Sequence, residues 1–140
     1  MVKVLVAIRP EDADVMRHVF GDEFEVISCI TLAEAQAALS PDLAMIACGV
    51  HFDDGRMFNL LKQVKADPQL SAIPFWGILR DEGLLSSAIT RGIRTAMKSM
   101  GASGLFNLSQ VDTDGEGETA YRELRGVIRT SLVDKPDSPA

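Results

Sequence analysis

Residues 43–50 read LAMIACGV and are followed by HFDDG at residues 51–55. A continuous apolar run of this length is typical of a strand that is buried on both faces of a parallel sheet. The polar, glycine-containing stretch after it predicts the loop at the carboxyl end of that strand. We therefore take residues 43–50 as the central strand and interpret the rest of the chain outward from it.

Four further apolar segments have the length and composition of strands. The first, VKVLVAI at residues 2–8, is rich in β-branched side chains and ends before Arg9 and Pro10. The segment at residues 73–79 contains a proline, which is tolerated at the start of a strand. The four predicted strands are residues 2–8, 24–30, 73–79 and 103–108.

Amphipathic segments separate these strands, with apolar residues recurring every three or four positions as on one face of a helix. One begins with TLAE at residues 31–34, which predicts a capping box, and another ends at Gly101. The predicted helices are residues 10–20, 32–39, 56–66, 84–100 and 121–132. Strands that alternate with helices indicate a parallel sheet covered on both faces, because the crossovers are right-handed. We expect one α/β domain at residues 1–133 and a flexible tail at residues 134–140.

Composition narrows the function classes. Apolar residues make up 46% of the 140 residues and charged residues 24%, as in ordinary globular proteins. The net charge of -6 disfavours nucleic acid and anionic membranes as direct partners. Cys29 and Cys48 lack the paired spacing of thiolate metal sites, so both are predicted to be core residues. We find no signal-peptide or transmembrane pattern and expect a cytoplasmic location.

Three segments resemble the response-regulator receiver family, whose members are CheY-like domains. They are PEDADVMRHVF at residues 10–20, DDGRMFNLLKQVKADPQLSAIPFW at residues 53–76 and MGASGLF at residues 100–106. They occur in the family's order. The resemblance implies a doubly wound, flavodoxin-like sheet with strand order 2-1-3-4-5 and five helices, and a role in two-component (phosphorelay) signal transduction.

Members of that family carry a magnesium-binding acidic pair after strand one, a phosphate-accepting aspartate at strand three, a hydroxyl residue at strand four and a lysine at strand five. The metal ion and the lysine offset the negative charge of the phosphoryl group, and the hydroxyl group forms a hydrogen bond to it. Matching the apolar runs places other residues at these positions: Ile8 and Arg9, Cys48 (or Ala47, counting back from Asp54), Leu79 and Leu108. The chain therefore resembles a degenerate pseudo-receiver, and we expect no enzyme activity, no metal and no cofactor.

In two alternative functions, this edge of the sheet accepts a phosphoryl group or binds a small molecule. Four carboxylates near the same edge, Glu11, Asp12, Asp53 and Asp54, could form a displaced acidic site in an atypical response regulator phosphorylated at Asp53 or Asp54. Phosphoryl transfer depends on positioning, which disfavours residues a turn away from the usual place. Alternatively, the vacated positions Ile8, Cys48, Leu79 and Leu108 could line an apolar pocket of a small-molecule sensor.

The remaining hypothesis is a module that works by protein binding. Arg91, Arg94 and Lys98 are spaced by three and four positions and share one helix face. The acidic segment at residues 112–118 has the opposite charge, an arrangement suited to steering or self-association. Strand five adds Leu105, at the position of the aromatic that moves in many receivers, and the adjacent Phe106. We expect this face to contact a signalling protein or a second copy in a homodimer.

Overall fold

The computed structural model describes residues 2–20, 24–80, 86–107, 125–126 and 129–130. Its centre is a sheet of five parallel strands in the order β2-β1-β3-β4-β5, which confirms the predicted order. The strands are β1 (Lys3–Ala7), β2 (Glu25–Cys29), β3 (Met45–Gly49), β4 (Phe75–Leu79) and β5 (Gly104–Asn107). The described helices are a 3-10 turn at Pro10–Asp12, α1 (Ala13–Phe20), α2 (Leu32–Ala38), α3 (Met57–Ala66) and α4 (Ser87–Ser99).

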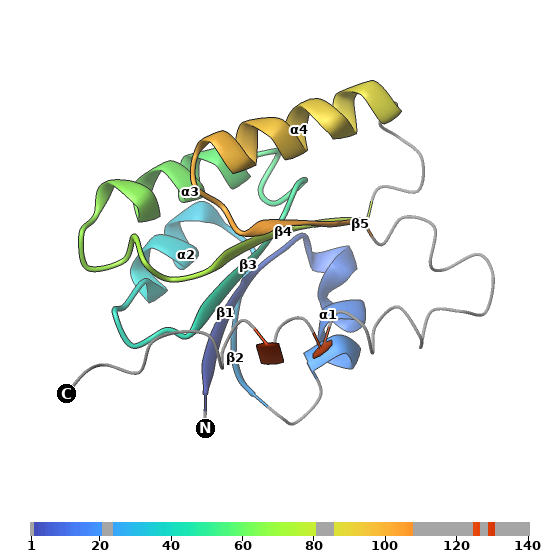
Figure 1. Ribbon diagram of the computed structural model, residues 1–140. Helices are drawn as coiled ribbons and strands as arrows, with labels where there is room; N and C mark the ends of the chain where they lie inside the picture. Colours follow the sequence, from blue (N-terminus) through green and yellow to red (C-terminus); the bar gives the residue numbers. More distant parts are fainter. Residues whose placement is uncertain (1, 21–23, 81–85, 108–124, 127–128, 131–140) are drawn as a thin grey trace.

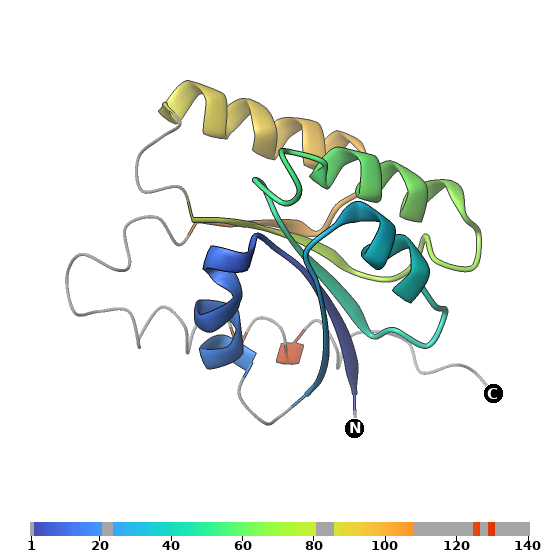
Figure 2. The ribbon, with the colours of Figure 1, turned by 180° about the vertical axis from the view of Figure 1, so that it is seen from behind.

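Helices cover both faces of the sheet. α2, α3 and α4 lie on one face and α1 lies on the other (Figures 1 and 2). β3 occupies the middle, and all five of its residues are buried, as expected for a strand covered on both sides. The apolar run at residues 43–50 therefore predicted the central strand correctly.

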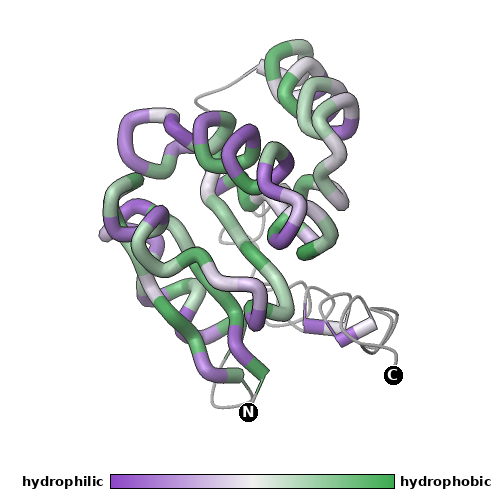
Figure 3. Tube along the Cα trace, turned by 90° about the vertical axis from the view of Figure 1, so that its left-hand side faces the viewer, coloured by the Kyte–Doolittle hydropathy of each residue, from purple (hydrophilic) through white to green (hydrophobic). Residues whose placement is uncertain are grey.

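Each face of the sheet has its own hydrophobic core. On the α2–α3–α4 side, Leu5, Ile46 and Phe75 pack with Leu60 and other α3 residues. On the α1 side, the core is formed by residues of β1, β3 and β4 together with Met16, Val19 and Phe20 of α1 and with Phe24. Hydrophilic and hydrophobic residues recur within the turns of the helices, as expected of amphipathic helices (Figure 3).

The helix ends follow local sequence rules. Thr31 accepts a hydrogen bond from the backbone of Glu34, whose side chain bonds back, so the predicted capping box is confirmed. α4 begins at Ser87 because the Ser86 hydroxyl accepts from the Ile89 backbone N–H, and Gly101 follows α4 with a φ of 92°.

Two glycines allow close packing around β4. A Cβ on Gly77 would lie 2.5 Å from Cε of Met97, so the glycine lets α4 approach the sheet. A Cβ on Gly104 would lie 2.6 Å from the Trp76 ring, which stacks on Phe106 with ring centroids 4.9 Å apart. A methyl group at either position would force the neighbouring Met97 or Trp76 side chain to move, so glycine suits this packing.

Four α-helices are seen in the described part of the chain, against five predicted. The fifth, at residues 121–132, lies mostly outside the described residues, although residues 125–126 and 129–130 are helical. The acidic segment at residues 112–118, Leu108 and the tail at residues 134–140 also lie outside them. Among the described residues, no helix is both long enough and apolar enough to cross a membrane.

Candidate functional site

The carboxyl ends of β1, β3 and β4 meet at one edge of the sheet, where ligands of doubly wound folds bind. Register places Cys48 opposite Ala7 on one side and Gly77 on the other, so the three strands end nearly level. The residues that follow, Ile8 and Arg9 after β1 and Arg80 after β4, line this edge. A ligand-binding or reactive site of this fold is therefore expected at this edge.

The positions assigned to the phosphoryl chemistry hold buried apolar groups. Ile8 and Leu79 each expose 1% of their surface, and Ala47 and Cys48 expose none. The Cys48 thiol contacts the Gly49 carbonyl at 3.7 Å, and burial raises the pKa of this thiol well above its ordinary value. None of these side chains offers a nucleophile or a hard oxygen ligand to solvent.

Arg9, Asp12 and Arg80 form a cluster that we call the arginine latch. Arg9 donates to the Asp12 carboxylate through Nε at 2.8 Å and Nη2 at 3.1 Å, and Arg80 donates to it through Nη1 at 3.2 Å. Arg9 Nη2 also donates to the Arg80 backbone carbonyl at 2.6 Å. The latch therefore ties the turn after β1 to the end of β4.

Burial makes the latch more than a surface ion pair. Asp12 is the only charged residue among the described residues that is classed as buried, and the Arg9 and Arg80 side chains expose 21% and 20%. A buried carboxylate needs counter-charges and hydrogen bonds, and two guanidinium groups supply both. The hydrogen bonds to Asp12 are the main cause of a raised pKa of Arg9.

The other three carboxylates of the predicted displaced acidic site do not contact one another, and Glu11 alone of the three pairs with a latch residue among the described interactions. Glu11 is exposed, with its carboxylate 3.8 Å from Arg9. Asp53 accepts a hydrogen bond from the Leu32 backbone at 2.8 Å, so it holds the start of α2. Asp54 is exposed, and both aspartates have a positive φ, 44° at Asp53 and 58° at Asp54. Glu11 and Asp12 thus share Arg9 as a partner, whereas Asp53 is engaged with the start of α2.

The solved structures described next share this fold over 91–100% of the chain. A response regulator from Hahella chejuensis superposes with a TM-score of 0.73 at 14% identity, covering 99% of this chain and all of that one. The Mn²⁺-bound form of response regulator Rcp1 gives 0.70 at 17% identity, covering both chains completely. The chemotaxis response regulator CheY4 of Vibrio cholerae gives 0.63 at 20% identity, covering 91% of this chain and 98% of that one.

The fold is that of response-regulator receiver domains. No protein-family model and no curated protein sequence matches the chain, so the likeness lies in the structure. The arrangement of strands and helices is shared, while sequence identity is too low to transfer residue roles.

The receiver fold implies a Mg²⁺ site at this edge, and the residues here do not fit one. Mg²⁺ requires oxygen ligands, mainly carboxylates and water. At the end of β1, Ile8 is aliphatic and Arg9 is cationic, and the nearby Asp12 carboxylate already binds two guanidinium groups. Among the described residues, no group of three or more His, Cys, Asp or Glu side chains could hold a metal ion.

The basic row on α4 is only partly as predicted. Arg91 and Lys98 are exposed, but Arg94 donates from Nη1 to the Leu105 carbonyl at 2.9 Å. β5 is an edge strand, so this carbonyl points away from the sheet and needs a donor. Arg94 therefore fastens α4 to β5 and contributes less to the basic surface than its spacing suggests.

Sequence reasoning did not identify Arg80 as part of the site. The signal was available in principle: Arg9 and Arg80 both follow strands that end at the same sheet edge, and two such cations need a nearby carboxylate. Asp12, in the first turn after β1, is the nearest acid in the sequence.

Proposed function

We propose that this domain is a two-component signalling module that works by protein binding and does not accept a phosphoryl group. The receiver fold over the whole chain supports the signalling role. The arginine latch is the main observation behind the second part of the proposal, that the domain does not accept a phosphoryl group. It fills the sheet edge after β1 and β4 with two guanidinium groups paired to a carboxylate, which speaks against a metal ion binding there.

Phosphoryl transfer at this edge would have to overcome three obstacles. The acceptor position is a buried Cys48 or Ala47, neither of which forms an acyl phosphate. A divalent cation would compete with Arg9 and Arg80 for Asp12, and Asp53 is engaged with the α2 backbone. Without the metal, the charge of the transferring group lacks its usual stabilisation.

Incubation with acetyl phosphate and Mg²⁺, followed by intact-mass measurement, tests this proposal directly. We expect no phosphate adduct under conditions that phosphorylate an ordinary receiver domain assayed in parallel. Asp53→Asn and Asp54→Asn variants provide the assignment if an adduct forms. An adduct that disappears in either variant would establish the rival function, an atypical response regulator phosphorylated at that residue.

For the binding surface, we propose the α4–β5 face with its exposed Arg91 and Lys98. An exposed basic row on an otherwise acidic chain favours an acidic partner surface, either on a signalling protein or on a second copy. Buried Leu105 packs beneath α4, whereas half-buried Phe106 lies on the opposite face of β5 against Trp76, so of these two residues only Leu105 adjoins the basic row.

Charge reversal at Arg91 and Lys98 tests the surface. The double variant Arg91→Glu and Lys98→Glu is compared with Lys62→Glu, an equally exposed lysine on α3. Sedimentation velocity over a range of concentrations should show that the double variant weakens self-association by about tenfold, whereas the control does not. Self-association that is unaffected by both, in a chain that does associate, excludes this face as the dimer contact.

A further inference from the structure

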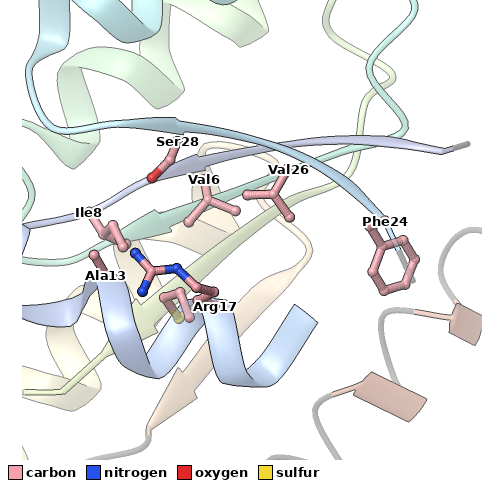
Figure 4. A pocket seen from close by; sticks show the side chains of 8 residues that line it. Val6, Ile8, Ala13, Arg17, Phe24, Val26 and Ser28 are labelled. Carbon is pink, nitrogen blue, oxygen red and sulfur yellow. The ribbon is translucent and has the colours of Figure 1, made fainter. Parts of the chain in front are cut away.

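A groove lies on the α1 side of the sheet, on the opposite face from α4. It runs between α1 and the strands β1 and β2 and has a volume of about 220 Å³. Its lining is mostly apolar (Figure 4): Val6, Ile8, Ala13, Met16, Arg17, Phe24, Val26 and Ser28. Val26, on the edge strand, is 36% exposed, which is unusual for a large apolar side chain in this chain.

The two ends of the groove differ in chemistry. The guanidinium of Arg17 and the hydroxyl of Ser28 lie at the end near Ile8 and Ala13, whereas Phe24 lies at the opposite end (Figure 4). The Arg17 side chain is 75% exposed and donates through Nη1 to Asp14 at 2.8 Å. That bond orients the guanidinium, and a guanidinium has five N–H donors, so a second acceptor can share it.

We propose that this groove binds a small carboxylic acid whose apolar part is an alkyl chain or a single ring. The carboxylate would accept hydrogen bonds from Arg17 and Ser28, and the apolar part would cover Val6 and Val26. The volume equals that of about seven water molecules in the liquid, which suits a ligand of about seven to ten non-hydrogen atoms.

Charge and polarity favour a carboxylate over the other small-ligand classes, even though Asp14 already accepts one Arg17 hydrogen bond. An organic cation would place its charge against Arg17. A hydrocarbon of the same shape would desolvate the Arg17 and Ser28 donors without giving them an acceptor, which is unfavourable. A carboxylate satisfies both donors, and charge-assisted hydrogen bonds to a guanidinium are among the stronger ones.

The groove adjoins the arginine latch along the chain. Ile8 and Ala13 line the groove, and Arg9 and Asp12 of the latch lie between them in sequence. A bound acid would therefore contact the same turn that the latch holds. This inference is independent of the proposed function, since it needs neither a phosphoryl group nor a protein partner.

Titration of the full ¹⁵N-labelled chain with hexanoate, followed by NMR, tests the proposal. We expect saturable shifts of the amides of residues 6–8, 13–17 and 24–28, with a dissociation constant in the millimolar range typical of so small a ligand. Hexan-1-ol should bind about tenfold more weakly and hexylamine not at all. Equal binding of all three compounds, or shifts centred elsewhere, would overturn the proposal.

Three variants assign the binding to the groove. Arg17→Gln should weaken hexanoate binding about tenfold, and Val26→Trp should abolish it by filling the groove. Both positions are at least partly exposed, so the variants should fold, which their dispersed spectra would verify. Lys62→Gln, which removes an exposed cation from α3, is the control and should bind like the unmodified chain. Hexanoate affinity that is unchanged by Arg17→Gln contradicts the assigned carboxylate position.

Discussion

Replacing Asp12 by asparagine removes the negative charge from the arginine latch and leaves Arg9 and Arg80 facing each other. Three guanidinium-to-carboxylate hydrogen bonds of 2.8–3.2 Å are weakened, at a side chain that is only 10% exposed. Breaking a fully buried ion pair costs about 3–5 kcal/mol, whereas an exposed pair is worth about 0–1 kcal/mol. The arginines are about one fifth exposed, so we expect a loss of about 2–3 kcal/mol in the free energy of unfolding.

The chain contains a matched control for this substitution. Arg17 and Asp14 form an ion pair with the same three-residue separation and the same 2.8 Å distance, but their side chains are 75% and 89% exposed. Asp14→Asn should therefore cost about 0.5 kcal/mol or less. The two pairs differ chiefly in burial and in the second arginine, which are the features on which the estimate depends.

Urea unfolding at neutral pH measures both losses. Double-mutant cycles with Arg9→Met and Arg17→Met should give a coupling energy of about 1.5–2 kcal/mol for the latch and below about 0.5 kcal/mol for the exposed pair. In thermal unfolding, Asp12→Asn should lower Tm by about 10 °C. If the two coupling energies are equally small, the latch is an ordinary surface contact and does not hold the turn after β1 against the end of β4.

Three other substitutions test the packing and the buried thiol. Gly77→Ala should lower the free energy of unfolding by about 1–3 kcal/mol, measured by thermal unfolding, because the added methyl group meets Met97. In a chain that already carries Met97→Ala, the same substitution should cost less. Thr31→Ala should cost about 1 kcal/mol and speed amide exchange in α2, and unchanged exchange would speak against the capping box as its anchor. The raised pKa of Cys48 keeps its thiol protonated in the native state, while the unfolded chain ionises near the ordinary value of 9.0. Stability should then fall as pH rises above 9, by about 1.4 kcal/mol per pH unit for this thiol, and a Cys48→Ala variant with the same slope would disprove the cause.

Much of the fold could be predicted because buried parallel strands leave a strong signal. The run at residues 43–50 contains β3 entire, and the segment at residues 24–30 exceeds β2 by only one residue at each end. The start of α4 was placed too early, at residue 84, because leucines at positions 84 and 85 extend the apolar periodicity. The Ser86 hydroxyl decides where the regular helix begins, and a capping hydrogen bond is a local feature that periodicity does not register.

The site could be predicted less fully, because its contacts join distant parts of the chain. Sequence alone placed Arg9 at the sheet edge, but its contact with Arg80 depends on how the turns after β1 and β4 approach each other across β3. The role of Arg94 was missed for a similar reason. Helical spacing identified the face it shares with Arg91, whereas only the edge position of β5 explains why its guanidinium bonds the Leu105 carbonyl.

The arginine latch also limits how this domain could switch. A ligand shifts a conformational equilibrium only through a difference in its interaction with the two states. In a metal-binding receiver, the cation and the phosphoryl group supply that difference by changing the charge at the sheet edge. Here the positive charges belong to Arg9 and Arg80 and are already matched to Asp12, so the edge has no charge change to offer. Under the proposed function, a signal changes this domain through another surface, and the α4–β5 face and the α1–β2 groove are the two surfaces that we propose for it.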